Sequence, residues 1–428
     1  MLNLISKTSG VLTILVLISL AGCVNSESAD ESTSTLSPKS TSHANILTAV
    51  TDEVIIPTYQ KFAAQTENWA SITSPITSYC ASIGQPDETA QLNQAQQSWR
   101  DAMGYWQQAE AFHIGPATDN EDNLRNRIYS WPGFVNRCTV DSNVITFDNQ
   151  KQDFDMQTAP RQARGLDALE YLLFNTNLNH SCPSQITATQ NWNQQPQQQR
   201  QQLRCQYASQ VAHDIAQNAQ TLVNAWLDSG NNYRQKFLGS GSDNGAFESQ
   251  QTALNTLSDR LFYLDTNVKD IKLAIPMGLS SQCNALTCPD HMESADSDNG
   301  LANLKNNLLG FQALFNGSFA PSSTAFSFDD MLVTKNFPEI AERIQQKTTA
   351  ILDLIAAAPD TFSASITAIN NTTSQTECIN AANNPDTTSE LFACRLYGKV
   401  KQLTDEIKGD FLTVINLNLP SRVEGDND

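Results

Sequence analysis

Two carboxylates, Asp167 and Glu170, lie three residues apart in the stretch 163–174, which reads ARGLDALEYLLF. On a helix, residues with this spacing share one face, so both acids would point to the same place. Carboxylate oxygens are hard ligands that suit calcium, magnesium, manganese or ferric iron better than zinc. The pair is therefore a candidate site for a divalent or ferric cation, or for a small polar ligand.

The same two acids also fit an ordinary helix surface. Arg164 precedes Asp167 by three residues, and Arg161 lies close by in the sequence. An arginine at this spacing can form an ion pair with an aspartate on a helix surface. Asp167 and Glu170 would then belong to a solvated or salt-bridged face that holds no ligand. The sequence leaves both interpretations open.

A second acid, Glu110, is followed three residues later by His113. Both continue, at intervals of four and three, an apolar helical face that consists of Trp99, Met103 and Trp106. Glu-x-x-His is one half of the ligand set found inside di-iron helical bundles. If Glu110 and His113 faced Asp167 and Glu170 across a bundle, four ligands would converge on one metal ion. The alternative is a capping or hydrogen-bonded histidine beside the turn Gly115-Pro116.

Helical periodicity dominates the chain from about residue 44 onward. The clearest apolar seam consists of Leu254, Leu257, Leu261, Leu264, Val268, Ile271 and Ile275. Because no sustained alternating run with hairpin turn signals occurs, the fold is predicted to be all-α. The glycine-rich run 230–245 is the strongest internal linker candidate. We therefore expect two packed, four-helix-bundle-like domains, residues 44–230 with the Gly-x-Asp-x-x-Glu segment and residues 246–417.

The N-terminal residues 1–22 are typical of a signal peptide, with Lys7 before an apolar run that is too short to span a membrane. The tetrad that ends at Cys23, LAGC, resembles the bacterial lipobox, whose cysteine is lipidated and becomes the first mature residue. The alternative is an ordinary secretory signal with a chance cysteine. Residues 23–43 are rich in Ser and Thr, so we expect a flexible tether. Position 24 is Val rather than Asp, which resembles the pattern of lipoproteins that are passed on to the outer membrane. We therefore expect the protein in the outer membrane, facing the periplasm or the cell surface.

Eight of the nine cysteines follow Cys23, and an even number in an exported chain predicts disulfides. Pairing between neighbours is the simplest arrangement: Cys80–Cys138, Cys182–Cys205, Cys283–Cys288 and Cys378–Cys394. A thiolate zinc site is disfavoured, because no Cys-x-x-Cys occurs. The formal net charge of −19 argues against nucleic acid as a partner, because its phosphates would be repelled.

The segment around Asp167 resembles the imelysin-like proteins, also known as the M75 peptidase family. Its Gly165, Glu170 and the apolar residues that follow match the family signature Gly-x-His-x-x-Glu, but Asp167 stands where the family has His. Four further segments resemble the family in order: Trp106 to Pro116, Ile128 to Pro132, Met292 to Ser294, and Leu304 to Gly317. The resemblance spans residues 44–417.

This resemblance implies two packed helical bundles, a periplasmic or surface location, and an association with iron acquisition. It also implies a metallopeptidase activity in which Glu170 would be a ligand or general base and Asp167 a substitute ligand. A peptidase zinc site prefers nitrogen or sulfur donors and keeps one open position. With Asp167 in place of His, an active peptidase is not favoured. The further candidate ligand-binding residues are Glu110, His113, Trp131, Glu293 and Ser294.

The sequence thus favours an exported lipoprotein that acts as a binding or accessory component of the cell envelope, and the family resemblance implies a role in iron uptake. Its partners would be the membrane, through Cys23, and components of iron uptake or a peptide. Two other functions remain open. One is a metallopeptidase of the M75 type, and the other is a metal-independent module that binds a peptide or a partner protein.

Overall fold

The regular secondary structure of the described part of the protein is helical, and loops connect the helices. The computed structural model describes residues 43–133, 136–321, 323–384 and 389–415. These ranges contain no strand, so the predicted all-α fold is confirmed. Within the same ranges no helix has the length and apolar character needed to cross a membrane. The signal peptide, the lipidated cysteine and the tether were predicted for residues that lie outside this description, apart from residue 43.

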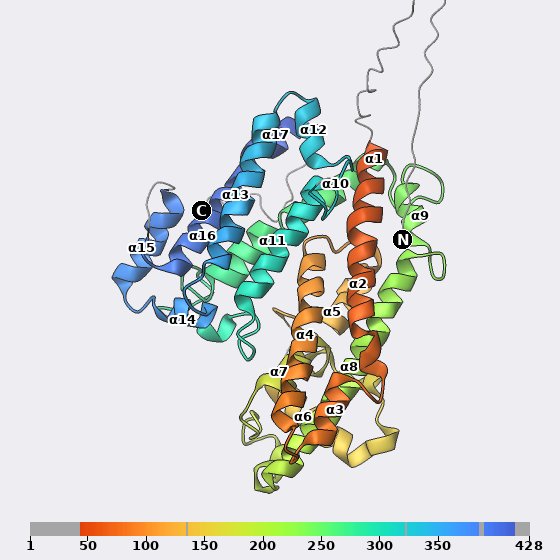
Figure 1. Ribbon diagram of the computed structural model, residues 1–428, viewed down its shortest axis with the longest axis vertical. Coiled ribbons are helices and arrows are strands. Elements are labelled where there is room, and N and C mark those ends of the chain that lie inside the picture. Colours follow the sequence, from red (N-terminus) through yellow and green to blue (C-terminus); the bar gives the residue numbers. More distant parts are fainter. Residues whose placement is uncertain (1–42, 134–135, 322, 385–388, 416–428) are drawn as a thin grey trace, which may run out of the picture. The chain divides into compact units, whose positions relative to one another are not determined.

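The first half of the chain forms a group of helices around the long helices α4 and α8 (Figure 1). Helices α2, α3 and α7 each pack against both of them. Trp99 and Trp106 of α4 and Tyr207 of α8 are fully buried, as the spacing of apolar side chains predicts. The elements are α1 (His43–Ala49), η1 (Val50–Ile55), α2 (Ile56–Glu67), α3 (Pro75–Ser82), α4 (Glu88–Glu110), α5 (Asp119–Ile128), α6 (Arg137–Gln150), α7 (Gly165–Phe174), α8 (Gln197–Trp226) and α9 (Tyr233–Leu238).

The second half forms another group, in which α11, α13, α16 and the π-helical segment η9 pack together. The apolar seam predicted from Leu254 to Ile275 is buried almost throughout. It is divided between two consecutive helical segments, α10 and η9. The elements are α10 (Gln250–Leu261), η9 (Leu264–Ala274), α11 (Gly300–Asn316), α12 (Phe328–Thr334), α13 (Pro338–Ala356), α14 (Phe362–Thr367), α15 (Thr372–Asn383), α16 (Phe392–Glu406), η11 (Ile407–Phe411) and α17 (Leu412–Ile415). Segments of π-helix occur often at functional sites.

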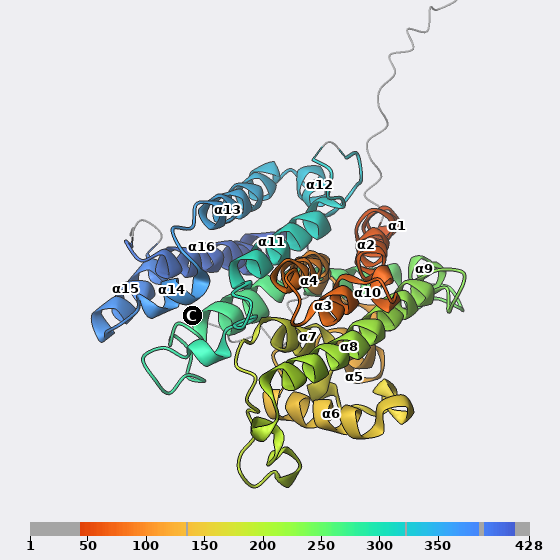
Figure 2. The same ribbon diagram turned by 60° about the horizontal axis from the view of Figure 1, so that its bottom comes forward.

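The two groups meet where α11 lies against α4 (Figure 2). A Cβ atom on Gly310 would lie 2.1 Å from the carbonyl oxygen of Gln108, so only glycine allows this approach of the two helices. Gln108 donates a hydrogen bond of 2.9 Å to Asn306, and Asn307 donates one of 2.7 Å to the backbone oxygen of Gln107. This contact fixes the loop before α11 relative to the first group of helices.

Four disulfides link the cysteines of the described chain: Cys80–Cys205, Cys138–Cys182, Cys283–Cys288 and Cys378–Cys394. The neighbour pairing predicted from the sequence is correct for the last two and wrong for the first two. Cys80 on α3 meets Cys205 on α8, at a sequence separation of 125 residues, because these helices pack together. Cys138 of α6 is left to pair with Cys182, in the long loop after α7.

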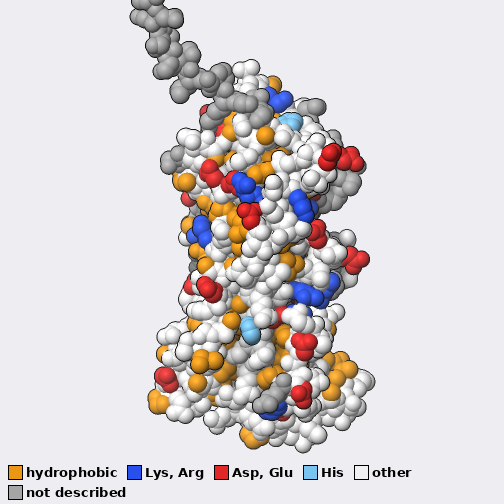
Figure 3. All heavy atoms as spheres, turned by 90° about the vertical axis from the view of Figure 1, so that its right-hand side faces the viewer, with side chains coloured by type: hydrophobic (Ala, Val, Ile, Leu, Met, Phe, Trp, Pro, Cys, Tyr) orange, Lys and Arg blue, Asp and Glu red, His pale blue; other side chains and the backbone are white. Residues whose placement is uncertain are grey.

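Charged side chains are dispersed among neutral ones on the face shown in Figure 3. Acidic and basic groups intermix there, and no continuous basic patch crosses this face. With a formal charge of −19 on the whole chain, such a surface offers little attraction to a phosphate backbone. The absence of a nucleic-acid partner stays a prediction.

Candidate functional site

The start of α7 is fixed by a glycine and a buried ion pair. Gly165 has a φ of +87°, and a Cβ atom there would lie 2.9 Å from the carbonyl oxygen of Ile128. Any other residue would be strained in this conformation and would push α7 away from the end of α5. Arg164 forms an ion pair with Asp214 of α8, in which its Nε lies 3.0 Å from Oδ2. Arg164 therefore does not form the local ion pair with Asp167 that the sequence allowed.

Asp167 lies in the first turn of α7 and is held by Ser130, which follows α5. Its Oδ2 accepts hydrogen bonds from the hydroxyl (2.6 Å) and the backbone N–H (3.2 Å) of Ser130, and its Oδ1 accepts one from Ala168 N–H (3.1 Å). The residue is only 7% exposed. Burial raises the pKa of Asp167 to about 6, although the hydrogen bonds from Ser130 act in the opposite direction.

Glu170 lies one turn further along the same face and is held by the loop before α11. Its Oε1 accepts hydrogen bonds from the backbone N–H (2.9 Å) and the hydroxyl (2.8 Å) of Ser297. Burial raises the pKa of Glu170 to about 8, and the negative charges of Asp296 and Asp167 act in the same direction. With both acids buried, the interpretation of this face as a solvated surface patch is wrong.

Asp167 and Glu170 both line a cavity of about 650 Å³. Trp131 and Ser294, two further candidates from the sequence, line it as well. Segments from both halves of the chain contribute to its wall, which consists of Tyr129, Trp131, Pro132, Arg137, Asp167, Glu170, Tyr171, Ile271, Ile275, Gln282, Asp290, His291, Met292, Ser294, Ala295 and Asp296. The structure thus brings together acids and rings that lie up to about 170 residues apart in the sequence.

Glu293, another predicted residue, lies in a buried polar network and is not part of the cavity wall. Its Oε1 accepts hydrogen bonds from Gln107 (2.8 Å) and from the hydroxyl of Tyr129 (2.7 Å), while Oε2 lies 2.8 Å from Nζ of Lys272. Burial lowers the pKa of Lys272, and the charge of Glu293 opposes this shift. Lys272 also donates hydrogen bonds to Gln107 (2.7 Å) and Asn307 (2.8 Å). The network therefore ties η9 and α11 to α4.

Glu110 and His113 are buried together but do not join Asp167 and Glu170. Glu110 accepts hydrogen bonds from Arg125 (3.0 and 3.1 Å) and from side chains of Trp106 and Tyr263. Although burial acts to raise it, Arg125 and His113 hold the pKa of Glu110 below its usual value. Burial lowers the pKa of His113 to about 4.

The hypothesis of four converging ligands does not hold. Among the described residues, no three His, Cys, Asp or Glu side chains are grouped so that they could hold a metal ion. The charge of Glu110 is instead balanced within the protein by Arg125. Asp167 and Glu170 remain a pair of carboxylates beside two serine hydroxyls. These oxygens suit a hard cation or an organic ligand. His291 lines the same cavity, but among the described residues it is not grouped with the two acids so that the three could hold a zinc ion.

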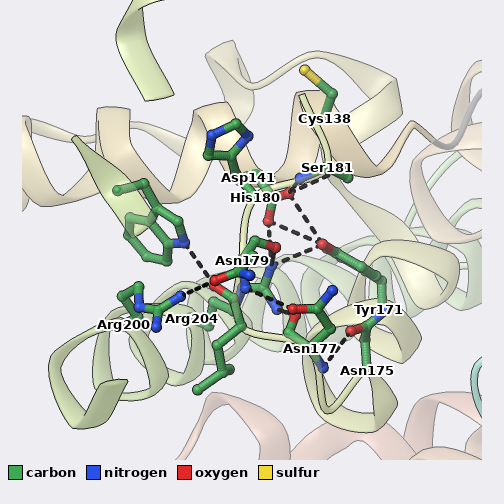
Figure 4. Close-up of polar contacts among 12 residues, drawn as sticks. Cys138, Asp141, Tyr171, Asn175, Asn177, Asn179, His180, Ser181, Arg200 and Arg204 are labelled. Atoms are coloured by element: carbon green, nitrogen blue, oxygen red, sulfur yellow. Dashed lines mark hydrogen bonds and ion pairs between the residues drawn. The ribbon is translucent and has the colours of Figure 1, made fainter. Parts of the chain in front are cut away.

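A second buried ion pair holds α7 through Tyr171, which lines the same cavity (Figure 4). Arg204 of α8 donates hydrogen bonds to Asp141 of α6 (2.7 Å) and to the hydroxyl of Tyr171 (2.8 Å). Asp141 also accepts hydrogen bonds from the backbone N–H (2.7 Å) and the hydroxyl (2.9 Å) of Ser181, in the loop after α7. Since Tyr171 directly follows Glu170, this cluster fixes the rotation of α7 and keeps its acidic face toward the cavity.

Sequence reasoning missed the residues that hold the two acids. Ser130 and Ser297 carry no pattern that marks them as partners of Asp167 and Glu170, because these contacts depend on tertiary packing. Lys272 did carry a signal. It lies four residues after Val268 and three before Ile275, so its position predicts a charged group on the apolar face of a helix.

Comparison with known proteins identifies the family. The family model of imelysin, the M75 peptidase family, matches residues 55–388. The chain belongs to the imelysin family. One relative of this imelysin-family protein is iron-regulated protein A of Synechococcus elongatus, 24% identical over 311 residues, which are 72% of this chain and 74% of that protein.

Two solved structures share the imelysin fold. An imelysin-like protein from Psychrobacter arcticum has a TM-score of 0.56 at 17% identity, over 88% of this chain and 96% of that chain. A candidate iron-regulated protein A precursor from Parabacteroides distasonis has a TM-score of 0.55 at 18% identity, over 85% of this chain and 95% of that chain. At this level of identity the likeness concerns the fold alone.

Proposed function

We propose that this imelysin-family protein is an exported, lipid-anchored binding component of the outer membrane, facing the periplasm or the cell surface, that serves iron uptake. It would hold a cation or a small polar ligand in the cavity lined by Asp167 and Glu170. The observation that carries the binding role is this pair of buried carboxylates in the wall of a cavity of about 650 Å³. The lipobox-like sequence that ends at Cys23 supports export. The name of the cyanobacterial relative, iron-regulated protein A, supports the link to iron.

The chemistry of the two acids supports the ligand-binding role. Buried carboxylates are costly unless they are paired or coordinate a cation, and burial keeps the pKa of both groups above the usual range. A bound cation would favour the charged forms and remove this cost. Asp167 and Glu170 are therefore arranged to gain more from a positively charged ligand than exposed acids would.

A metallopeptidase is the competing function, because the family is also named as a peptidase family. Carboxylate and hydroxyl oxygens are a poor donor set for the zinc ion of such an enzyme. We therefore expect that the protein has no chelator-sensitive activity that cleaves unfolded polypeptides. Hydrolysis that is lost both with chelator and in Glu170→Gln would overturn this expectation.

A complementation experiment tests the proposed function. We expect deletion of the gene in the source organism to lower cellular iron during growth under iron limitation, and the wild-type gene to restore it. The double variant Asp167→Asn, Glu170→Gln should fail to restore iron content, because it loses both charges; each amide oxygen can still accept the hydrogen bonds of Ser130 or Ser297, and only the bond from Ala168 N–H is lost. A matched control, Glu342→Gln with Asp353→Asn, removes two exposed charges from α13 and should restore it fully.

Anchoring is tested separately by labelling cells with a radioactive fatty acid and isolating the protein. We expect label in the wild-type protein and none in Cys23→Ala, and we expect the wild-type protein in the outer-membrane fraction. Normal iron content in the deletion strain would refute the role in iron uptake. An unlabelled wild-type protein would refute the lipid anchor but leave the binding role to be judged by complementation.

A further inference from the structure

The cavity beside Asp167 and Glu170 is larger than a metal ion requires. Its volume is about 650 Å³, whereas a bound metal ion occupies only the space between oxygen ligands about 2.0–2.6 Å away. Much of the wall is apolar or aromatic, and this part consists of Tyr129, Trp131, Pro132, Tyr171, Ile271, Ile275, Met292 and Ala295. Such a wall suits the hydrocarbon part of an organic molecule, because apolar lining with a few polar groups is typical of small-molecule sites.

The polar part of the wall is acidic. Asp290 and Asp296 join the two acids of α7, and the basic residues are Arg137 and His291. Arg137 forms an ion pair of 2.9 Å with Asp296, so its charge is matched within the wall. Acids that line a cavity with low-dielectric walls concentrate cations there. The cavity therefore favours a positively charged ligand over a neutral or negative one.

Glu170 offers this ligand an acceptor atom. Its Oε1 accepts both hydrogen bonds from Ser297, whereas Oε2 accepts none from the described residues. The residue is only 6% exposed and lines the cavity. Because Glu170 lines the cavity, this second oxygen is left for a ligand to reach. An ammonium or guanidinium N–H would satisfy it with a charge-assisted hydrogen bond.

The rings in the wall already bind cations of the protein itself. The ammonium group of Lys272 lies 5.4 Å from the ring centroid of Trp131, and the guanidinium of Arg137 lies 5.6 Å from that of Tyr171. Lys272 combines its ring contact with an ion pair to Glu293. A ring and a carboxylate together hold an organic cation through cation–π attraction and charge pairing. Both rings also face the cavity, so a ligand would meet the same two kinds of group.

We propose that the cavity binds an organic cation, an ammonium or guanidinium group on a short hydrocarbon chain. The charged group would pair with Glu170, and the hydrocarbon chain would lie against Trp131 and Ile275. This inference rests on the proposed function, because it names the class of ligand for the same cavity. The cation belongs either to a free amine or guanidine or to a lysine or arginine side chain of a peptide, since these present the same group.

Calorimetry and saturation-transfer NMR on the purified protein test this with butylammonium, butylguanidinium, 1-butanol and butyrate. We expect the two cations to bind and the neutral and anionic analogues not to bind. Glu170→Gln keeps an acceptor for Ser297 but loses the charge, and it should weaken binding of the cations by at least about tenfold. Asp290→Asn, at an exposed position of the wall, should weaken it by about threefold. The control Glu342→Gln should leave the affinity unchanged.

Several results would overturn the proposal. These are binding of 1-butanol as tight as that of butylammonium, no binding of either cation at millimolar concentration, and unchanged affinity in a folded Glu170→Gln variant. Binding of Ca²⁺ or Mn²⁺ that butylammonium does not displace would also overturn it, while the binding role in the proposed function would stand. A blocked Gly-Lys-Gly peptide separates the two sources. If the peptide binds more tightly than butylammonium, the site is assigned to a lysine or arginine side chain of a peptide. If the two bind equally, the site is assigned to a free cation.

Discussion

Replacing Glu170 by glutamine should change how the stability of the protein depends on pH. The pKa of Glu170 in the folded protein is about 8, against about 4.3 in an unfolded chain. Between these values the folded state binds the proton more tightly, so the free energy of unfolding falls as pH rises and the loss is complete above pH 8. From pH 5 to pH 9 the loss due to Glu170 amounts to on the order of 4 kcal/mol. Because glutamine cannot ionise, the Glu170→Gln variant does not undergo this loss of unfolding free energy.

Urea unfolding of wild type and Glu170→Gln at pH 5, 7 and 9 measures this difference. The two proteins should differ by about 1 kcal/mol at pH 5, and the variant should be the more stable by several kcal/mol at pH 9. Asp167 and Asp296, whose negative charges also raise the pKa of Glu170, are present in both proteins. Glu342→Gln controls for the loss of one exposed acid. A difference that stays constant within about 1 kcal/mol from pH 5 to pH 9 would refute the reasoning.

Two further changes test how the site is built. Gly165→Ala should lower the free energy of unfolding by about 1–3 kcal/mol, because residue 165 has a positive φ and its Cβ would meet the backbone of α5. Gly133→Ala is the control, because a Cβ there would meet nothing within 4 Å. Equal losses of stability in the two variants would contradict the argument. Lys272→Met should cost about 3–5 kcal/mol in chemical denaturation, because it leaves the buried Glu293 without its cation. Adding Glu293→Gln should restore part of this loss, and a double variant no more stable than the single one would show that the ion pair is not the cause.

Part of the site could be predicted from the sequence because it depends on local geometry. The spacing of Asp167 and Glu170 places them on one face of a helix, and the structure has both in the wall of one cavity. The roles of their neighbours could not be predicted in the same way. Arg164 is in helical register to pair with Asp167, yet it pairs with Asp214 on α8, because residue 164 precedes α7 in an extended conformation that turns its side chain away from the helix. A buried ion pair across two helices thus replaces the local one.

The sequence by itself determined the all-α fold and the shared face of the two acids. Both follow from the period of a helix, which acts within a few positions of the chain. Only the tertiary structure decided that Ser130 and Ser297 hold the acids, that Lys272 pairs with Glu293, and that Cys80 meets Cys205. These contacts join residues tens to more than a hundred positions apart. The burial that raises both pKa values depends on the same long-range packing, because desolvation is set by everything that surrounds a group.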